Sequence, residues 1–107
     1  MLLDGERQVV ETSIIIEYLQ LAHPGPVHLL PTDPMAALEA RFLDRFFDLH
    51  VMNIVQLAVD SQLQKLPMPP ETGRAIAAEK LERAYDWLEQ ALVGRTWAAG
   101  EDFTLAD

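Results

Sequence analysis

The sequence contains no cysteine, few basic residues and no long apolar run. Without cysteine, these residues hold no disulfide, no cysteine nucleophile and no thiolate metal ligand. Eight lysine and arginine residues against seventeen acidic residues give a formal net charge of -9, and no basic run interrupts this balance. A phosphate backbone would be repelled, so nucleic acid is excluded as an expected partner. No apolar run reaches the length that a membrane span or signal segment needs, and we expect no membrane association.

What the chain does contain is 50% hydrophobic residues, enough for one modest core in 107 residues. Two short apolar-rich runs, residues 1–3 and 8–10, flank the turn-forming dipeptide Asp4-Gly5 and predict a β-hairpin. Because an isolated hairpin is marginal in water, we expect further strands before Met1.

A short helix is expected after the hairpin. Its apolar side chains recur at helical spacing, at Ile15, Tyr18, Leu19 and Ala22. Thr12 or Ser13 could cap its first turn. The helix should end near Ala22, because the segment His23-Pro24-Gly25-Pro26 cannot continue it.

Two longer helices should follow. Asp33-Pro34 is a strong helix start, and neither glycine nor proline occurs between Met35 and Leu66, so we expect one helix of roughly 45 Å that ends at Pro67. A second helix, antiparallel to the first, should close near Gly94. Its stripe consists of Ala77, Leu81, Ala84, Leu88 and Ala91.

The segment Phe103-Thr104-Leu105-Ala106-Asp107 has the form of a capping box. Thr104 would be the cap, Asp107 would occupy the position three residues later, and Phe103 is placed for a hydrophobic staple. We expect the helix that this box begins to lie beyond Asp107, so that the chain would be one part of a longer protein.

Glu11-Thr12 places a carboxylate and a hydroxyl beside the unpaired amides of a helix start. Such a corner could bind a zwitterion, with the ammonium on Glu11 and the carboxylate on the Thr12 amide and hydroxyl. Taken alone, a Glu-Thr pair before a helix is more often a simple cap.

The surrounding residues resemble the cytosolic glutathione transferases of bacterial type. In that family the hairpin and third helix carry the pattern Glu-Ser, two residues, Ile, two residues, Tyr-Leu, and here the matching residues are Glu11-Thr12, Ile15 and Tyr18-Leu19. The resemblance continues through Leu30-Pro31, Arg41, Asp44-Arg45-Phe46 and Asp48 to the segment Phe103 to Asp107, and so spans essentially the whole chain.

The resemblance implies a mainly α fold: a partial transferase C-terminal helical domain, preceded by the β-hairpin and last helix of a thioredoxin-like domain. The expected divisions are residues 1–22 for the thioredoxin-like remnant, 23–33 for a linker and 34–107 for the helical part. It also implies a homodimer in the cytoplasm, with the long helix at the dimer interface and beside the pocket for a hydrophobic electrophile.

The resemblance further implies that Glu11 and Thr12 bind the γ-glutamyl end of glutathione, the co-substrate. Thr12 replaces the commoner serine but keeps a hydroxyl and an amide. The family's thiol-activating Tyr, Ser or Cys, and its cis-proline, would precede Met1. No catalytic residue and no metal ligand is therefore assigned here, and we expect negligible transferase activity from these residues alone.

Several other side chains are of types that occur in functional sites, but their spacing favours a structural role. Tyr18 and Tyr85 should pack in the core, as should the aromatic and methionine residues Phe46, Phe47, Met52 and Trp87, although these four could also contact an apolar co-substrate. The charged residues Arg41, Asp44, Arg45 and Asp48 should form a solvated, salt-bridged face. The three histidines show no metal spacing and should lie in loops or on the surface: His23, His28 and His50.

Two other functions stay open. A non-catalytic, transferase-like protein-interaction module is the first, although a scaffold has no need for a carboxylate at Glu11. The second is a self-contained small helical protein without a ligand, which the unsupported hairpin and the unfilled capping box oppose. Apolar faces left exposed would favour a dimeric or aggregation-prone species.

Overall fold

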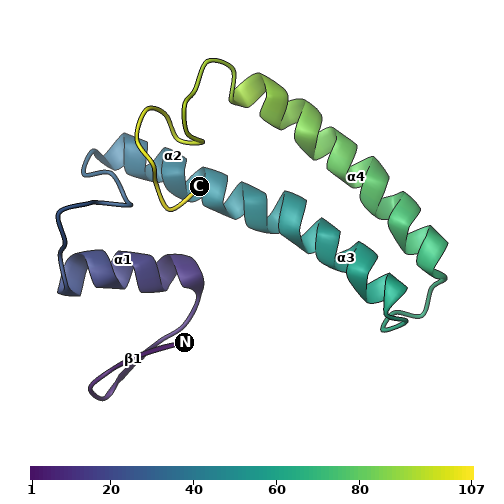
Figure 1. The fold of residues 1–107 in the computed structure, drawn as a ribbon, viewed down its shortest axis with the longest axis horizontal. Coiled ribbons are helices and arrows are strands. Elements are labelled where there is room, and N and C mark those ends of the chain that lie inside the picture. Colours follow the sequence, from purple (N-terminus) through teal and green to yellow (C-terminus); the bar gives the residue numbers. More distant parts are fainter. The chain divides into compact units, whose positions relative to one another are not determined.

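The computed structural model describes residues 1–107 and is mainly helical, with one two-stranded sheet before the helices (Figure 1). This confirms the predicted fold class. The chain forms two compact units, residues 1–44 with 95–107 and residues 45–94. No helix is both long enough and apolar enough to cross a membrane. The predicted boundaries at residues 22 and 33 are not tested by this grouping and stay a prediction.

The predicted hairpin is present. Strands β1 (Leu2–Asp4) and β2 (Arg7–Val9) are antiparallel, with Leu2 opposite Val9 and Asp4 opposite Arg7. The turn residues are therefore Gly5 and Glu6, one residue later than expected from Asp4-Gly5. Gly5 has a φ of +58°, which a type II′ hairpin turn requires at its first central position and which glycine adopts without strain.

Helix α1 (Thr12–Ala22) follows as predicted and ends at His23, immediately before Pro24. The expected cap is wrong, because the N-cap residue is Glu11 and no side chain caps the first turn. The Ser13 hydroxyl instead donates to Asp44 Oδ2 at 2.7 Å. No residue of α1 is fully buried, so polar contacts have a large share in holding this helix.

Helical residues continue from Pro34 to Gln62 as α2 (Pro34–Phe46), the π-helical segment η1 (Phe47–Met52) and α3 (Asn53–Gln62). The predicted start is confirmed, because Asp33 Oδ2 accepts from the Ala36 amide at 2.8 Å. The π-helical segment was not predicted, since no glycine or proline marks it. Short π-helical segments within α-helices often occur at functional sites.

The prolines do not end this helical run, contrary to the prediction. Gln64 has a left-handed backbone with φ 55°, and the Lys65 amide donates to the Asp60 carbonyl at 2.9 Å. The Gln64 amide also donates to the Ser61 carbonyl at 3.1 Å. These two bonds form a Schellman motif, which closes the helix before Pro67 is reached.

Helix α4 (Pro70–Ala91) packs antiparallel to α3 within residues 45–94 (Figure 1). Ala77, Ala84 and Leu88 of the predicted stripe are buried. The two helices approach each other closely at Gly73, where an added Cβ would lie 2.1 Å from Ser61 Oγ and 2.3 Å from Ser61 Cβ. Small residues therefore set the distance between the two helices.

In the other unit, the core consists of Leu30, Ala37 and Ala40, against which Ala99 and Leu105 pack. The Leu105 amide donates to the Leu29 carbonyl at 2.8 Å, so the C-terminal segment and the segment before α2 are joined by backbone as well as by apolar contact.

Many large apolar side chains stay exposed, among them Met35, Leu38, Phe42, Leu49 and Met52 along the helical run from Pro34. Exposed apolar faces of this kind were expected. The dimeric or aggregation-prone behaviour inferred from them stays a prediction.

Candidate functional site

Glu11 and Thr12 lie at the corner between β2 and α1, and both side chains are exposed. The first hydrogen bond of the helix runs from the Ile15 amide to the Glu11 carbonyl at 2.9 Å. The amides of Thr12, Ser13 and Ile14 precede that bond and so have no acceptor within the helix. The corner combines a carboxylate, a hydroxyl and the positive end of a helix dipole.

The backbone of Glu11 is in an uncommon conformation, with φ 70° and ψ 128°. A non-glycine residue in a sparsely populated region costs about 1–3 kcal/mol and persists where surrounding structure enforces it. Glu11 and Gln64 are the two non-glycine residues with positive φ. Gln64 is explained by the Schellman motif, whereas no helix-ending motif explains Glu11. Glu11 is therefore the stronger candidate for a conformation kept for function.

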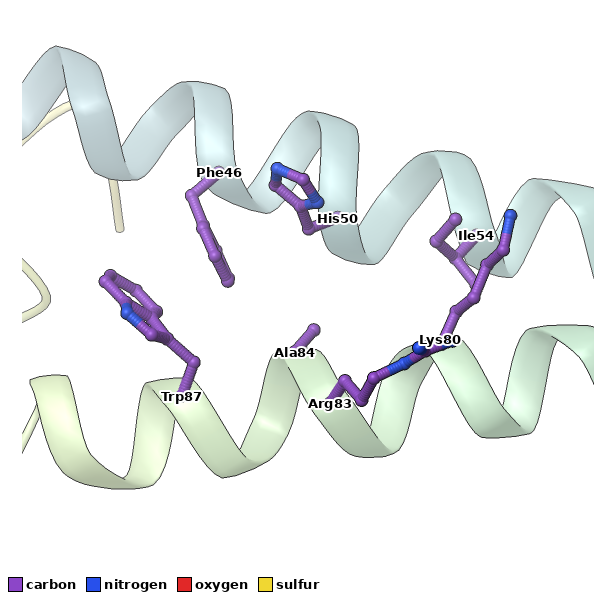
Figure 2. Close-up of a pocket in the computed structure, with 7 residues that line it drawn as sticks. All are labelled: Phe46, His50, Ile54, Lys80, Arg83, Ala84 and Trp87. Carbon is purple, nitrogen blue, oxygen red and sulfur yellow. The ribbon is translucent and has the colours of Figure 1, made fainter.

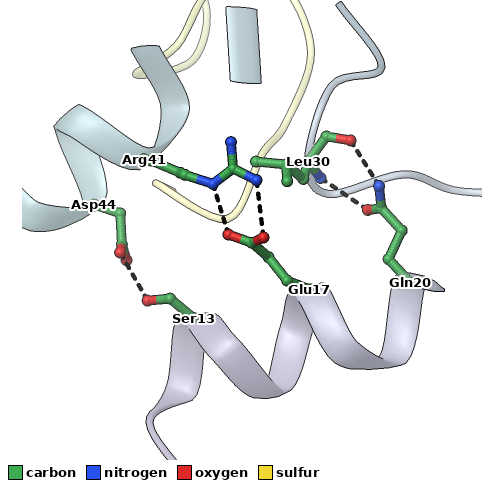
Figure 3. A network of polar contacts seen from close by, with 6 residues as sticks. All are labelled: Ser13, Glu17, Gln20, Leu30, Arg41 and Asp44. Atoms are coloured by element: carbon green, nitrogen blue, oxygen red, sulfur yellow. Dashed lines mark hydrogen bonds and ion pairs between the residues drawn. The ribbon is translucent and has the colours of Figure 1, made fainter. Parts of the chain in front are cut away.

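Three polar side chains of α1 tie it to its neighbours in residues 1–44 (Figure 3). In addition to the Ser13 contact with Asp44, Arg41 Nε and Nη2 donate to the two Glu17 carboxylate oxygens, each at 2.8 Å. The hydrogen bond from Arg41 lowers the pKa of Glu17 and, in return, raises the pKa of Arg41. Gln20 pairs with the backbone of Leu30, its amide donating at 2.8 Å and its oxygen accepting at 2.9 Å.

The predicted charged face of the long helix is thus only partly correct. Arg45 and Asp48 do form an exposed pair, three residues apart, at 4.0 Å. Arg41 and Asp44 instead contact Glu17 and Ser13 of α1, which lie 24 and 31 positions earlier in the sequence. Their role is to position the helix that begins at Glu11 and Thr12.

A second polar cluster joins α1 to the hairpin. Tyr18 donates to Asp4 Oδ2 at 2.6 Å, His23 Nε2 lies 2.8 Å from the same oxygen, and the Arg7 guanidinium lies 5.6 Å from the centre of the Tyr18 ring. The hydrogen bonds from Tyr18 and His23 lower the pKa of Asp4, and the bond to Asp4 raises the pKa of Tyr18. Tyr18 is partly buried and holds the hairpin against α1, in line with its interpretation as structural.

Other predictions about aromatic residues need correction. Tyr85, Trp87 and Met52 are 48%, 38% and 58% exposed, so none of them is a core residue. Tyr85 directly follows Ala84 and lies outside the buried stripe of α4. Trp87 lies three residues after Ala84, and its partly exposed ring stacks on that of Phe46 at 4.3 Å (Figure 2). Phe46 and Phe47 are partly buried, with their rings edge to face at 6.3 Å.

The three histidines are exposed, as expected. His23 and His28 lie outside the helices, whereas His50 lies on η1. No group of three or more histidine and acidic side chains is placed to hold a metal ion.

The polar contacts of the predicted capping box at Thr104 are present. Asp107 Oδ2 accepts from the Thr104 amide at 2.9 Å, and Thr104 Oγ1 accepts from the Ala106 amide at 3.3 Å. Asp107 Oδ1 also accepts from the Ala98 amide at 2.7 Å. Phe103 packs edge to face on Trp97 at 5.0 Å. These contacts are structural and lend no catalytic role to the segment.

Comparison with known proteins agrees with this fold. The family model described as glutathione S-transferase, C-terminal domain, matches residues 46–107, more than half of the chain. The chain therefore belongs to the glutathione S-transferase C-terminal domain family.

A relative is the glutathione S-transferase-like protein LUC7 from Fusarium sp, which is 33% identical over 99 residues. The alignment covers 91% of this chain and 44% of the relative, so the chain spans less than half of that protein's length. Because the alignment covers 91% of this chain, it extends into the residues before position 46, which lie outside the family match.

Proposed function

We propose that the chain is the part of a bacterial-type glutathione transferase that binds the γ-glutamyl end of glutathione, through Glu11 and Thr12. The observation that carries the proposal is the strained backbone of Glu11 at the start of α1. Membership of the transferase family supplies the ligand class. Strain at an exposed corner has no evident benefit for packing, and Glu11 directly precedes first-turn amides that have no acceptor within the helix.

The binding chemistry follows from the groups at this corner. The Glu11 carboxylate would accept from the ammonium of the γ-glutamyl group. The Thr12 amide and hydroxyl would donate to its carboxylate, which the positive end of α1 also favours. Each charge-assisted hydrogen bond contributes about 1.5–3 kcal/mol. We assign no residue of this chain to thiol activation.

The whole protein would add the glutathione thiolate to a hydrophobic electrophile, as a cytoplasmic homodimer. The exposed apolar side chains of η1, such as Leu49 and Met52, support an association surface. No residue described here is proposed to bind a metal.

Titration by NMR tests the γ-glutamyl site directly. We expect glutathione to shift the Thr12 and Ser13 amide resonances of the 107-residue chain, and the dipeptide Cys-Gly, which lacks the γ-glutamyl group, to leave them unchanged. Glu11→Gln should weaken glutathione binding at least tenfold, because one charge-assisted bond is lost. Glu6→Gln, an exposed carboxylate in the hairpin turn, is the matched control and should bind normally.

Thr12→Ser should keep binding, because it keeps the hydroxyl, and Thr12→Val should weaken it. Equal shifts with Cys-Gly, or normal binding by Glu11→Gln, would contradict the proposed site.

A non-catalytic interaction module is the second candidate, favoured by the same exposed apolar side chains. Glutathione binding by neither the parent chain nor Glu11→Gln, together with a stable complex with another protein, would support it over the transferase proposal.

A further inference from the structure

A pocket of about 620 Å³ lies between the segment that leads into α2 and the C-terminal segment, entirely within the unit of residues 1–44 with 95–107. One wall is formed by residues between positions 26 and 36, and the other by residues 102–104. This volume falls in the range of small-molecule sites, roughly 300–1,000 Å³. No residue of the Glu11 and Thr12 corner lines the pocket.

The two walls of the pocket are held together by bonds within the chain. The Leu105 amide donates to the Leu29 carbonyl at 2.8 Å, which joins the two segments directly. Thr104 is buried, and its hydroxyl is fixed by the contacts of the capping box. In the other wall, Pro26 and Pro31 restrict the backbone. The pocket is therefore formed before a ligand arrives, which lowers the entropic cost of binding.

Both walls of the pocket carry accessible apolar surface. Phe103 is 47% exposed, although its ring packs edge to face on Trp97 at 5.0 Å. On the facing wall Val27 is 70% exposed and lies beside Pro26. These side chains can contact the apolar body of a ligand, and the aromatic ring of Phe103 can also attract a cation.

The charged groups of the pocket are carboxylates, one on each wall. Asp102 forms no hydrogen bond or ion pair within the chain. Asp33 accepts from the Met35 and Ala36 amides through Oδ2, which leaves Oδ1 without a donor. No lysine or arginine lines the pocket, and His28 is the remaining ionisable side chain in it. Two carboxylates on a chain with a net charge of -9 favour a cationic ligand.

We propose that this pocket binds an organic ammonium ion, a small molecule with an apolar body and one primary ammonium group. The ammonium would contact the carboxylates of Asp33 and Asp102, and the apolar body would pack on Phe103 and Val27. The proposal goes beyond glutathione binding and does not rest on it, since the two sites share no residue.

A matched pair of probes tests the proposal by NMR titration of the 107-residue chain. 1-Naphthylmethylamine and 1-naphthalenemethanol have the same ring framework, and at neutral pH only the first carries a positive charge. At low ionic strength we expect the ammonium probe to bind about ten times more tightly than the alcohol, with one site per chain. The largest amide shifts should fall on His28, Thr32, Phe103 and Thr104, and the Thr12 and Ser13 amides should not shift.

Variants separate the charged and apolar contacts. Asp33→Ser with Asp102→Asn should lower the affinity of the ammonium probe about tenfold and leave that of the alcohol unchanged. Serine at position 33 keeps an oxygen that can cap α2, so the helix start is preserved. Phe103→Leu should weaken both probes. The control is Glu6→Gln with Glu101→Gln, which changes the net charge equally outside the pocket and should change neither affinity. Circular dichroism should confirm that each variant keeps its helix content.

Three results would overturn the proposal. The first is equal affinity for the two probes. The second is a loss of ammonium binding in the control double variant as large as in the pocket double variant, which would mean that the net charge of the chain attracts the probe. The third is a set of amide shifts that leaves out residues 26–36 and 102–104, which would mean that the probe adheres to exposed apolar faces elsewhere.

Discussion

Gly73 offers the sharpest test of how α3 and α4 are held together. A Cβ at this position would meet Ser61 Oγ at 2.1 Å and Ser61 Cβ at 2.3 Å, and Ser61 is fully buried. A rotamer change could move Oγ but not Cβ, so the two helices would have to separate. Overpacking of this kind costs about 1–3 kcal/mol.

The intrinsic preference of the helix opposes this cost. Alanine is favoured over glycine within a helix by about 1 kcal/mol. Because the contact involves a Cβ with no freedom to move, we expect overpacking to dominate. The difference of the two effects predicts that Gly73→Ala destabilises residues 45–94 by up to about 2 kcal/mol. Urea unfolding, followed by Trp87 fluorescence in a Trp97→Phe background, measures the change.

A reciprocal substitution provides the control. Ser61→Gly in the Gly73→Ala background removes the clashing Cβ and should recover part of the lost stability, whereas Ser61→Ala leaves that Cβ in place and should not. Gly25→Ala should be close to neutral, because no atom lies within 4 Å of the added Cβ and the φ of Gly25 is not in the left-handed region. An increase in stability for Gly73→Ala would refute the reasoning.

Three further predictions follow from other contacts. Gln64→Gly should stabilise the chain by about 0.5–1 kcal/mol in urea unfolding, because glycine adopts the left-handed conformation without the cost borne by glutamine. Arg41→Lys should lower the midpoint of urea unfolding slightly, because a lysine keeps the charge but cannot form both bonds to Glu17. The folded-state pKa of Asp4 lies below its ordinary value of 3.8, so its contribution is present above that pH and is lost as the pH falls through the lowered pKa. In a Tyr85→Phe background, Asp4→Asn should bring the raised pKa of Tyr18 back toward 10.0 in an ultraviolet titration; an unchanged pKa would contradict the assigned cause.

Local sequence patterns predicted the elements of this fold well. Asp33-Pro34, the stripe of α4 and the capping box at Thr104 each depend on residues within a few positions of one another, and each is present in the structure. The predicted end of α3 was too late in the sequence, because the Schellman motif has Gln64 at the position where glycine is usual, and no glycine therefore indicates the helix end. The π-helical segment was missed for the same reason, since its sequence is compatible with an α-helix.

Contacts between distant residues could not be predicted in this way. Glu17 and Arg41 are 24 positions apart, and Ser13 and Asp44 are 31 positions apart. A charged helix face has the same pattern whether its partners are solvent or another helix.

These distant contacts explain how a strained corner can persist at Glu11. The anchoring residues of α1, Ser13, Glu17 and Gln20, recur at intervals of four and three, so they lie on one face of the helix. Each binds a group outside α1, and the helix has no fully buried apolar residue to fix it instead. A strained backbone persists only where its surroundings enforce it. We infer that the polar face of α1 contributes to that enforcement, while the first-turn amides at Thr12 and Ser13 have no acceptor within the helix.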